Sequence, residues 1–213
     1  MTEPQVTPVQ RVLLGAAGKE AKNAAWVFAL DNECAHIARV VREPMMGQIR
    51  LAWWRDALSS PTPMPEHRSD MVDALRALDR FDQMRPHLIA LVDAWEELIV
   101  GASDGADAFA RGRGAGLFAA LAPGGGAGAS LAGTLWALWD LAGKVDDEEL
   151  AAAALSSARK MAGTVRAVIP ALPRMLAMMA TVACNDVEQG KGAPRSLTPR
   201  LYWRLLRSQF FRV

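Results

Sequence analysis

The sequence has few of the residues that most often carry catalysis or bind metals. Of 213 residues, only two are cysteines, Cys34 and Cys184, and three are histidines, at positions 36, 67 and 87. The two cysteines lie far apart and lack the spacing of metal ligands, so we interpret them as buried free thiols in a reducing compartment. No histidine stands in a motif with a nucleophile, and the glycine-rich stretch 124–128 lacks the lysine of a phosphate-binding loop.

Excess charge and long apolar runs are also missing. The formal net charge is only +1, which gives no bulk attraction to nucleic acid or to an anionic membrane. The first ten residues lack the basic and apolar regions of a signal peptide, and no apolar run approaches the ~20 residues that span a bilayer. We therefore expect a cytoplasmic protein that does not bind nucleic acid, with peripheral membrane contact left open.

Strand-like alternation is absent as well, and apolar residues recur at intervals of three and four. Hydrophobic residues make up 51% of the chain, enough for a sizeable core. The glycine-rich stretch 123–128 is the best candidate for a domain boundary, but each side alone is too small for a good core. These features predict an all-α protein with one domain over residues 1–213.

Proline, glycine and capping residues set the expected helix limits. We expect Pro44 to stop a first helix, and Gly47 to allow a turn before a second, whose buried stripe is Leu51, Trp54 and Leu58 with Ile49 and Trp53 beside it. A last helix begins at Pro199, capped by Thr198. The other expected helices span 69–82, 86–99, with Pro86 first, 106–121, 129–142, 146–168 and 172–182. Three glycines in 106–121, at 112, 114 and 116, favour close helix packing or a kink.

One block is distinctive. Residues 43–58 read EPMMGQIRLAWWRDAL, with two tryptophans between two arginines after a Pro–Gly turn. The block resembles a stretch common in the squalene/phytoene synthase family, and the preceding WVFALDNECAHIARVV is similar to that family's first conserved helix. Weaker likeness continues through 91–97, 114–121 and 133–140. The resemblance implies a single-domain helical bundle of the isoprenoid synthase type.

The resemblance also implies a particular chemistry. Active members join two prenyl diphosphates with Mg²⁺, which carboxylates from two facing helices hold against the leaving diphosphate. Aligned with that pattern, the first aspartate pair falls on Ala35 and His36, and a phosphate-facing arginine becomes Asn32. Active members have a second metal-binding motif, on the facing helix. In this chain Lys144 stands where that motif has a carboxylate. Asp31 and Glu33 are two residues apart and lie on different faces of a helix.

Substitute carboxylates are not evident in the sequence. Aspartates three apart stand at 70/73, 79/82 and 104/107, and an acidic run covers 146–149, but none has a recognisable partner helix. We therefore expect no metal and no cofactor, and a non-catalytic lipid-binding or assembly-type protein. The alternative is an active Mg²⁺-dependent prenyl diphosphate condensing transferase of squalene/phytoene type in isoprenoid biosynthesis, with Mg²⁺ as its cofactor.

The resemblance suggests where a ligand would bind. The candidate substrate-binding residues are Arg50, Trp53, Trp54, Arg55, Trp136 and Asp140. Seven tryptophans can either fill a core or line an inherited prenyl pocket, and the two arginines can pair with Glu43 or Asp56 or meet an anionic head group. The expected partner is accordingly an isoprenoid or other lipid, or a protein.

Overall fold

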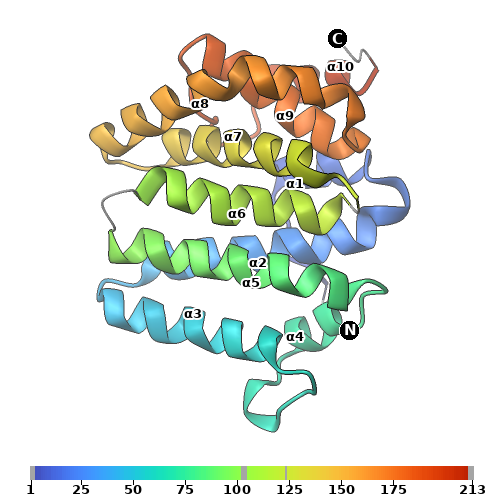
Figure 1. Cartoon of the computed structure of the whole chain (residues 1–213), viewed down its shortest axis with the longest axis vertical. Helices are drawn as coiled ribbons and strands as arrows, with labels where there is room; N and C mark the ends of the chain where they lie inside the picture. Colours follow the sequence, from blue (N-terminus) through green and yellow to red (C-terminus); the bar gives the residue numbers. More distant parts are fainter. Residues whose placement is uncertain (1–2, 102–104, 123, 211–213) are drawn as a thin grey trace.

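The chain folds as a single all-α helical bundle (Figure 1). The computed structural model describes residues 3–101, 105–122 and 124–210, with side chains through residue 208, and no strand occurs in these ranges. The α-helices are α1 Pro8–Leu14, α2 Ala21–Val40, α3 Pro44–Ser59, α4 Asp70–Arg76, α5 Phe81–Val100, α6 Gly105–Leu121, α7 Gly126–Lys144, α8 Glu148–Val168, α9 Arg174–Glu188 and α10 Pro199–Phe210. The expected fold class is confirmed at the level of an all-α bundle.

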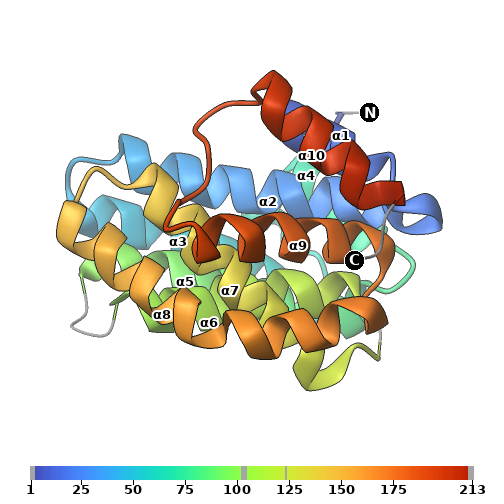
Figure 2. The same ribbon diagram turned by 90° about the horizontal axis from the view of Figure 1, so that it is seen from above.

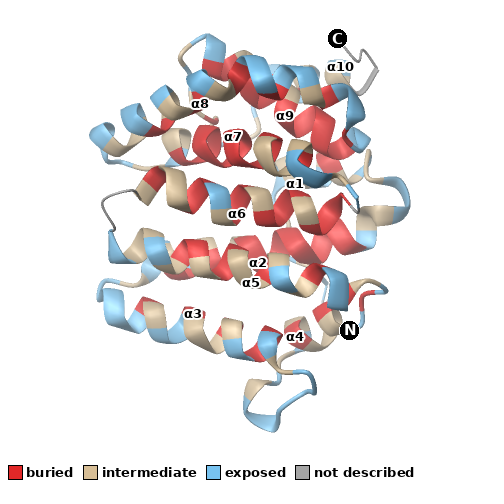
Figure 3. Cartoon of the chain, in the orientation of Figure 1, coloured by how far each residue is buried: buried red, intermediate tan, exposed pale blue. Residues whose placement is uncertain are grey.

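Five helices form a row in which each packs on the next: α3, α5, α6, α7 and α8. Helix α2 packs against α5 and α6 on one side of this row, and α9 packs against α7 and α8 (Figure 2). The buried side chains form one continuous core, concentrated along the middle helices (Figure 3). No described helix is both long enough and apolar enough to cross a membrane.

The glycines of α6 explain its central position. A Cβ added to Gly114 would overlap the backbone carbonyl of Gly133 on α7. A Cβ on Gly116 would lie 2.6 Å from the carbonyl oxygen of His87 on α5. Gly112 similarly lies close to Ala94, which is also on α5. The expected close packing is therefore confirmed, and α6 is thin enough for both neighbours to come near its axis.

Several expected boundaries are wrong. Helix α5 begins at Phe81 rather than Pro86, because the added turn buries Phe81 and Met84, and the helix predicted over 69–82 ends at Arg76. Gly47 lies inside α3 rather than in a turn before it, and a Cβ there would come 2.9 Å from Ile99 of α5. The gap between the predicted helices 86–99 and 106–121 includes residues 102–104, and the glycine-rich stretch 123–128 includes residue 123; these four residues lie outside the described residues.

Most of the other local expectations agree with the structure. Leu51, Trp54 and Leu58 are buried, whereas Ile49, expected beside them, is 56% exposed. The Thr198 hydroxyl accepts a hydrogen bond from the Leu201 backbone N–H at 3.1 Å and so caps α10. Both Cys34 and Cys184 are buried free thiols, as expected. Burial raises the pKa of the Cys184 thiol to about 11 and holds that of Cys34 well above its usual range.

Candidate functional site

Three helices bring charged side chains together in the middle of the core. The Arg113 guanidinium, on α6, donates from Nε and Nη2 to the two carboxylate oxygens of Asp31, on α2, at 2.8 Å each. Its Nη1 donates to Oδ2 of Asp140, on α7, at 2.7 Å. Arg113 is only 4% exposed, Asp31 2% and Asp140 6%. We call these three residues the charge cluster.

The local sequence places Arg113 and Asp31 on buried helix faces. Arg113 lies four residues after Phe109 and four before Leu117, and both of these are fully buried. Asp31 follows Leu30 and lies three residues before Cys34, which are also fully buried. Because α6 is narrow at its glycines, one guanidinium at its centre reaches carboxylates on both α2 and α7.

Aromatic rings enclose the guanidinium. The Arg113 Cζ lies 4.9 Å from the ring centroid of Trp95, 4.7 Å from that of Trp136 and 5.5 Å from that of Phe109. The Trp95 indole also donates from Nε1 to Oδ1 of Asp31 at 2.9 Å. Cation–π contact in a water-poor site stabilises a buried cation. The tryptophans here are therefore core residues that pack around a charge.

The charge cluster is neutralised at one edge by a lysine. Lys144 Nζ lies 2.7 Å from Oδ1 of Asp140, one helical turn away on α7. Burial alone would raise the pKa of the Asp140 carboxyl, but Lys144 and Arg113 together lower it from 3.8 to about 2. Burial acts against the charged form of Arg113 as well, and the two aspartates outweigh it and raise the guanidinium pKa. Two cations thus balance two carboxylates.

The charge cluster does not fit Mg²⁺. Asp31 and Asp140 come from two different helices, but their oxygens already accept hydrogen bonds from Arg113, Trp95 and Lys144. A divalent cation would face two positive groups at close range. Among the described residues, no group of three or more histidine, cysteine, aspartate or glutamate side chains is placed to hold a metal.

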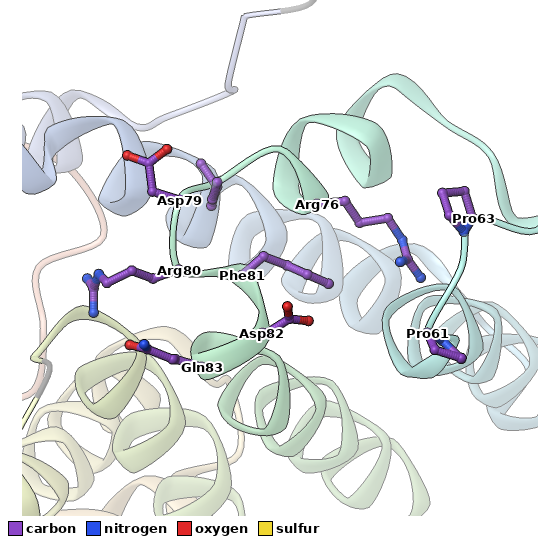
Figure 4. A pocket seen from close by; sticks show the side chains of 9 residues that line it. Pro61, Pro63, Arg76, Asp79, Arg80, Phe81, Asp82 and Gln83 are labelled. Atoms are coloured by element: carbon purple, nitrogen blue, oxygen red, sulfur yellow. The ribbon is translucent and has the colours of Figure 1, made fainter.

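The aspartate pairs noted in the sequence give no such site. Asp79 lies in the turn between α4 and α5 and Asp82 in the first turn of α5, and Figure 4 shows their carboxylates pointing in different directions. Asp104, of the 104/107 pair, lies outside the described residues. The two arginines of the surface hollow in Figure 4 have structural partners: Arg76 donates to the carbonyls of Ala57 and Ser60 at 2.7 Å each, and Arg80 pairs with Glu20.

The candidate residues on α3 lie apart from the charge cluster. Arg50 is 3.6 Å from Glu33, and Arg55 pairs with Asp93 at 2.5 Å and with Glu96, so the expected partners Glu43 and Asp56 are wrong. The Trp53 indole donates to the Glu66 carbonyl at 3.2 Å, and its ring packs edge-on against Trp54. Of the six candidate residues, only Trp136 and Asp140 contact Arg113.

Sequence reasoning did not single out Arg113, which organises the whole charge cluster. One signal was present: Arg113 is a cation on the apolar stripe of a glycine-rich helix, aligned with Phe109 and Leu117. Asp31 was noticed only as a poor metal ligand. Its role depends on α6, whose position relative to α2 is set by tertiary packing.

The fold and the charge cluster together define a helical-bundle protein whose central helices are joined by buried ion pairs. Comparisons of the chain with protein-family models, with curated proteins and with solved structures found no match.

Proposed function

We propose that this protein is a non-catalytic member of the squalene/phytoene synthase type, built on the isoprenoid synthase scaffold, and that it works as an assembly-type binding protein. The resemblance of residues 43–58 to that family supports the scaffold. The loss of both metal motifs, at Ala35, His36 and Lys144, supports the loss of prenyl transfer.

One observation carries the proposal: Arg113, on α6, joins carboxylates from two other helices, α2 and α7. In active members, carboxylates from two facing helices hold the metal that neutralises diphosphate. Here an internal guanidinium neutralises the carboxylates of Asp31 and Asp140. Its Nε and both terminal nitrogens already donate to Asp31 and Asp140 and its side chain is buried, so a diphosphate would have to displace these carboxylates to bind it.

The filled interior favours a protein partner over an isoprenoid ligand. Trp95, Phe109 and Trp136 occupy the space around Arg113 and leave the centre of the bundle filled by the protein's own side chains. The outer surface, by contrast, exposes apolar side chains near the start of α3, with Met45 64% and Ile49 56% exposed. This end of α3 packs on the end of α5 through Gly47 and Ile99. Methionines adapt readily to a partner surface, and this end of the bundle is the candidate contact.

An assay for released pyrophosphate tests the proposal. Purified protein is incubated with farnesyl or geranylgeranyl diphosphate and Mg²⁺, with a catalytically active squalene/phytoene synthase as positive control. We expect no pyrophosphate above the rate without protein. Mg²⁺-dependent turnover that is lost in the D140N variant would overturn the proposal and favour the prenyltransferase alternative.

A further inference from the structure

The distribution of charge along the chain is uneven. Residues 189–213 carry six basic residues and no acidic one, whereas the whole chain has a net charge of only +1. The preceding residues are therefore net acidic. Four aromatic residues, Tyr202, Trp203, Phe210 and Phe211, also fall in this last stretch. Helix α10 contains most of these residues.

One face of α10 is fixed to the bundle. Leu201 and Leu205 are 3% and 2% exposed, and α10 packs on α9 and α1. Arg204 pairs with the buried carboxylate of Asp186, on α9, at 2.7 Å and donates to the Val182 carbonyl at 3.2 Å. Helix α10 thus lies along one edge of the molecule, where Figure 2 shows it, with its inner face already occupied.

The outer face of α10 combines cations with aromatic rings. Arg200, Trp203 and Arg207 are spaced three and four residues apart, so they share one helix face, and all three are exposed. Trp203 is 69% exposed and its neighbour Tyr202 40%. Within the described part of the chain, neither Arg200 nor Arg207 forms an ion pair, unlike Arg204.

We propose that this outer face of α10 binds the surface of an anionic lipid bilayer, with Arg200 and Arg207 on lipid phosphates and Trp203 and Tyr202 at the level of the head groups. Arginine supplies the charge complementarity, and indole and phenol rings favour the membrane interface because one end is apolar and the other polar. The helix docks as folded, because Leu201, Leu205 and Arg204 remain packed on the bundle. The inference is independent of the proposed function.

A bilayer suits this face better than nucleic acid does. The cations are few and surround a protruding indole, and a membrane interface accepts such a ring without any specific pocket. Each arginine near an anionic surface changes partitioning by about fivefold, so two give a reversible attachment. The whole chain has a net charge of only +1, so the rest of the surface gives no attraction to an anionic membrane. The protein is therefore attracted only in the orientation in which α10 faces the bilayer.

Vesicle sedimentation of the full chain tests the proposal. The vesicles are phosphatidylcholine alone, or phosphatidylcholine with about one third phosphatidylserine, at about 0.1 M salt. We expect the protein to sediment with the anionic vesicles only, and high salt to release it. The R200Q/R207Q variant should partition about 25-fold more weakly, and W203A should also bind more weakly.

The matched control is R111Q/K160Q, which removes the same charge from exposed positions on α6 and α8, across the bundle from α10 in Figure 2. We expect this variant to bind like the wild type, and all variants to keep the wild-type circular dichroism spectrum, since the altered side chains are exposed. Failure of the wild type to bind anionic vesicles, or equal binding by R200Q/R207Q, would overturn the proposal. So would binding of single-stranded DNA, dependent on the same arginines, without vesicle binding.

Discussion

Arg113 and Asp31 form a two-point contact in which Nε and Nη2 of the guanidinium each donate to one carboxylate oxygen at 2.8 Å. Such a bidentate pair attracts the two helices to each other and also fixes their relative position. With Asp140 on the third helix, one side chain sets the spacing of α2, α6 and α7. Burial has also removed the hydration of each of the three ions. The charge cluster therefore stabilises the fold only while every partner is present.

Removing the arginine should therefore cost much more than removing a surface arginine. For R113M we expect a loss of about 3–5 kcal/mol in the free energy of unfolding, because Asp31 and Asp140 would remain buried with incomplete neutralisation. Urea denaturation measures this. R111M, two residues away and exposed, is the control and should change stability by at most about 0.5 kcal/mol. The triple variant D31L/R113M/D140L should be more stable than R113M alone, since it leaves no buried charge unpaired. An R113M protein as stable as the wild type would contradict this account of the charge cluster.

The depressed pKa of Asp140 should appear in acid unfolding. The pKa falls from 3.8 to about 2 on folding, so the native state binds this proton less readily than the unfolded chain. The contribution of roughly 2 kcal/mol is complete above pH ~4 and is lost as the pH falls through ~2. The D140N variant should lose this part of the pH dependence of unfolding free energy between pH ~4 and ~2. D82N, at a carboxylate 86% exposed, should keep it. Identical slopes in wild type and D140N would count against the assignment.

The close approach of α6 and α7 predicts a contrast between two glycines. G114A should destabilise the protein by about 1–3 kcal/mol, because its methyl group would overlap the backbone of Gly133. G163A, on the exposed side of α8 with open space around it, should be neutral or stabilise by up to about 1 kcal/mol through helix propensity. Thermal unfolding followed by circular dichroism compares the two. If G114A is as stable as G163A, the helices are farther apart than the structure places them.

Metal addition should leave stability unchanged. A ligand that binds only the native state stabilises it by RT ln(1 + [L]/Kd), so the melting temperature rises with ligand concentration once that concentration exceeds Kd. Because the carboxylates of the charge cluster are already paired, we expect millimolar Mg²⁺, with or without pyrophosphate, to shift Tm by less than about 1 °C relative to NaCl of equal ionic strength. A rise of several degrees with Mg²⁺ and pyrophosphate together would indicate a diphosphate site elsewhere in the bundle.

The sequence was most informative where a pattern was local. Intervals of three and four apolar residues indicated helices, Thr198 and Pro199 marked the start of α10, and the glycines of 106–121 indicated close packing. The start of α5 was misplaced because Pro86 was read as a first helical residue. Burial of Phe81 and Met84 outweighs the one backbone hydrogen bond that a proline removes.

The candidate site was only partly predictable. Trp136 and Asp140 were chosen through a family resemblance, and both contact Arg113. Arg50 and Arg55 were chosen on the same grounds, and they form ion pairs with Glu33, Asp93 and Glu96 instead. The resemblance pointed to residues on α3 and α7, but it could not show which of their side chains meet in the core.

By itself, the sequence determined that the chain is helical, where most of its helices lie, that both thiols are buried and that its last residues are basic. Each of these follows from spacing or composition within a short stretch. Only the tertiary structure decided that Asp31, Arg113 and Asp140 meet, because residues 82 and 27 positions apart come together through the packing of three helices. The same packing turned one face of α10 inward and left Arg200, Trp203 and Arg207 outside. Burial and ion pairing depend on the assembled core. They make Arg113 a residue that holds the fold together, and they leave Arg200 and Arg207 exposed on the surface.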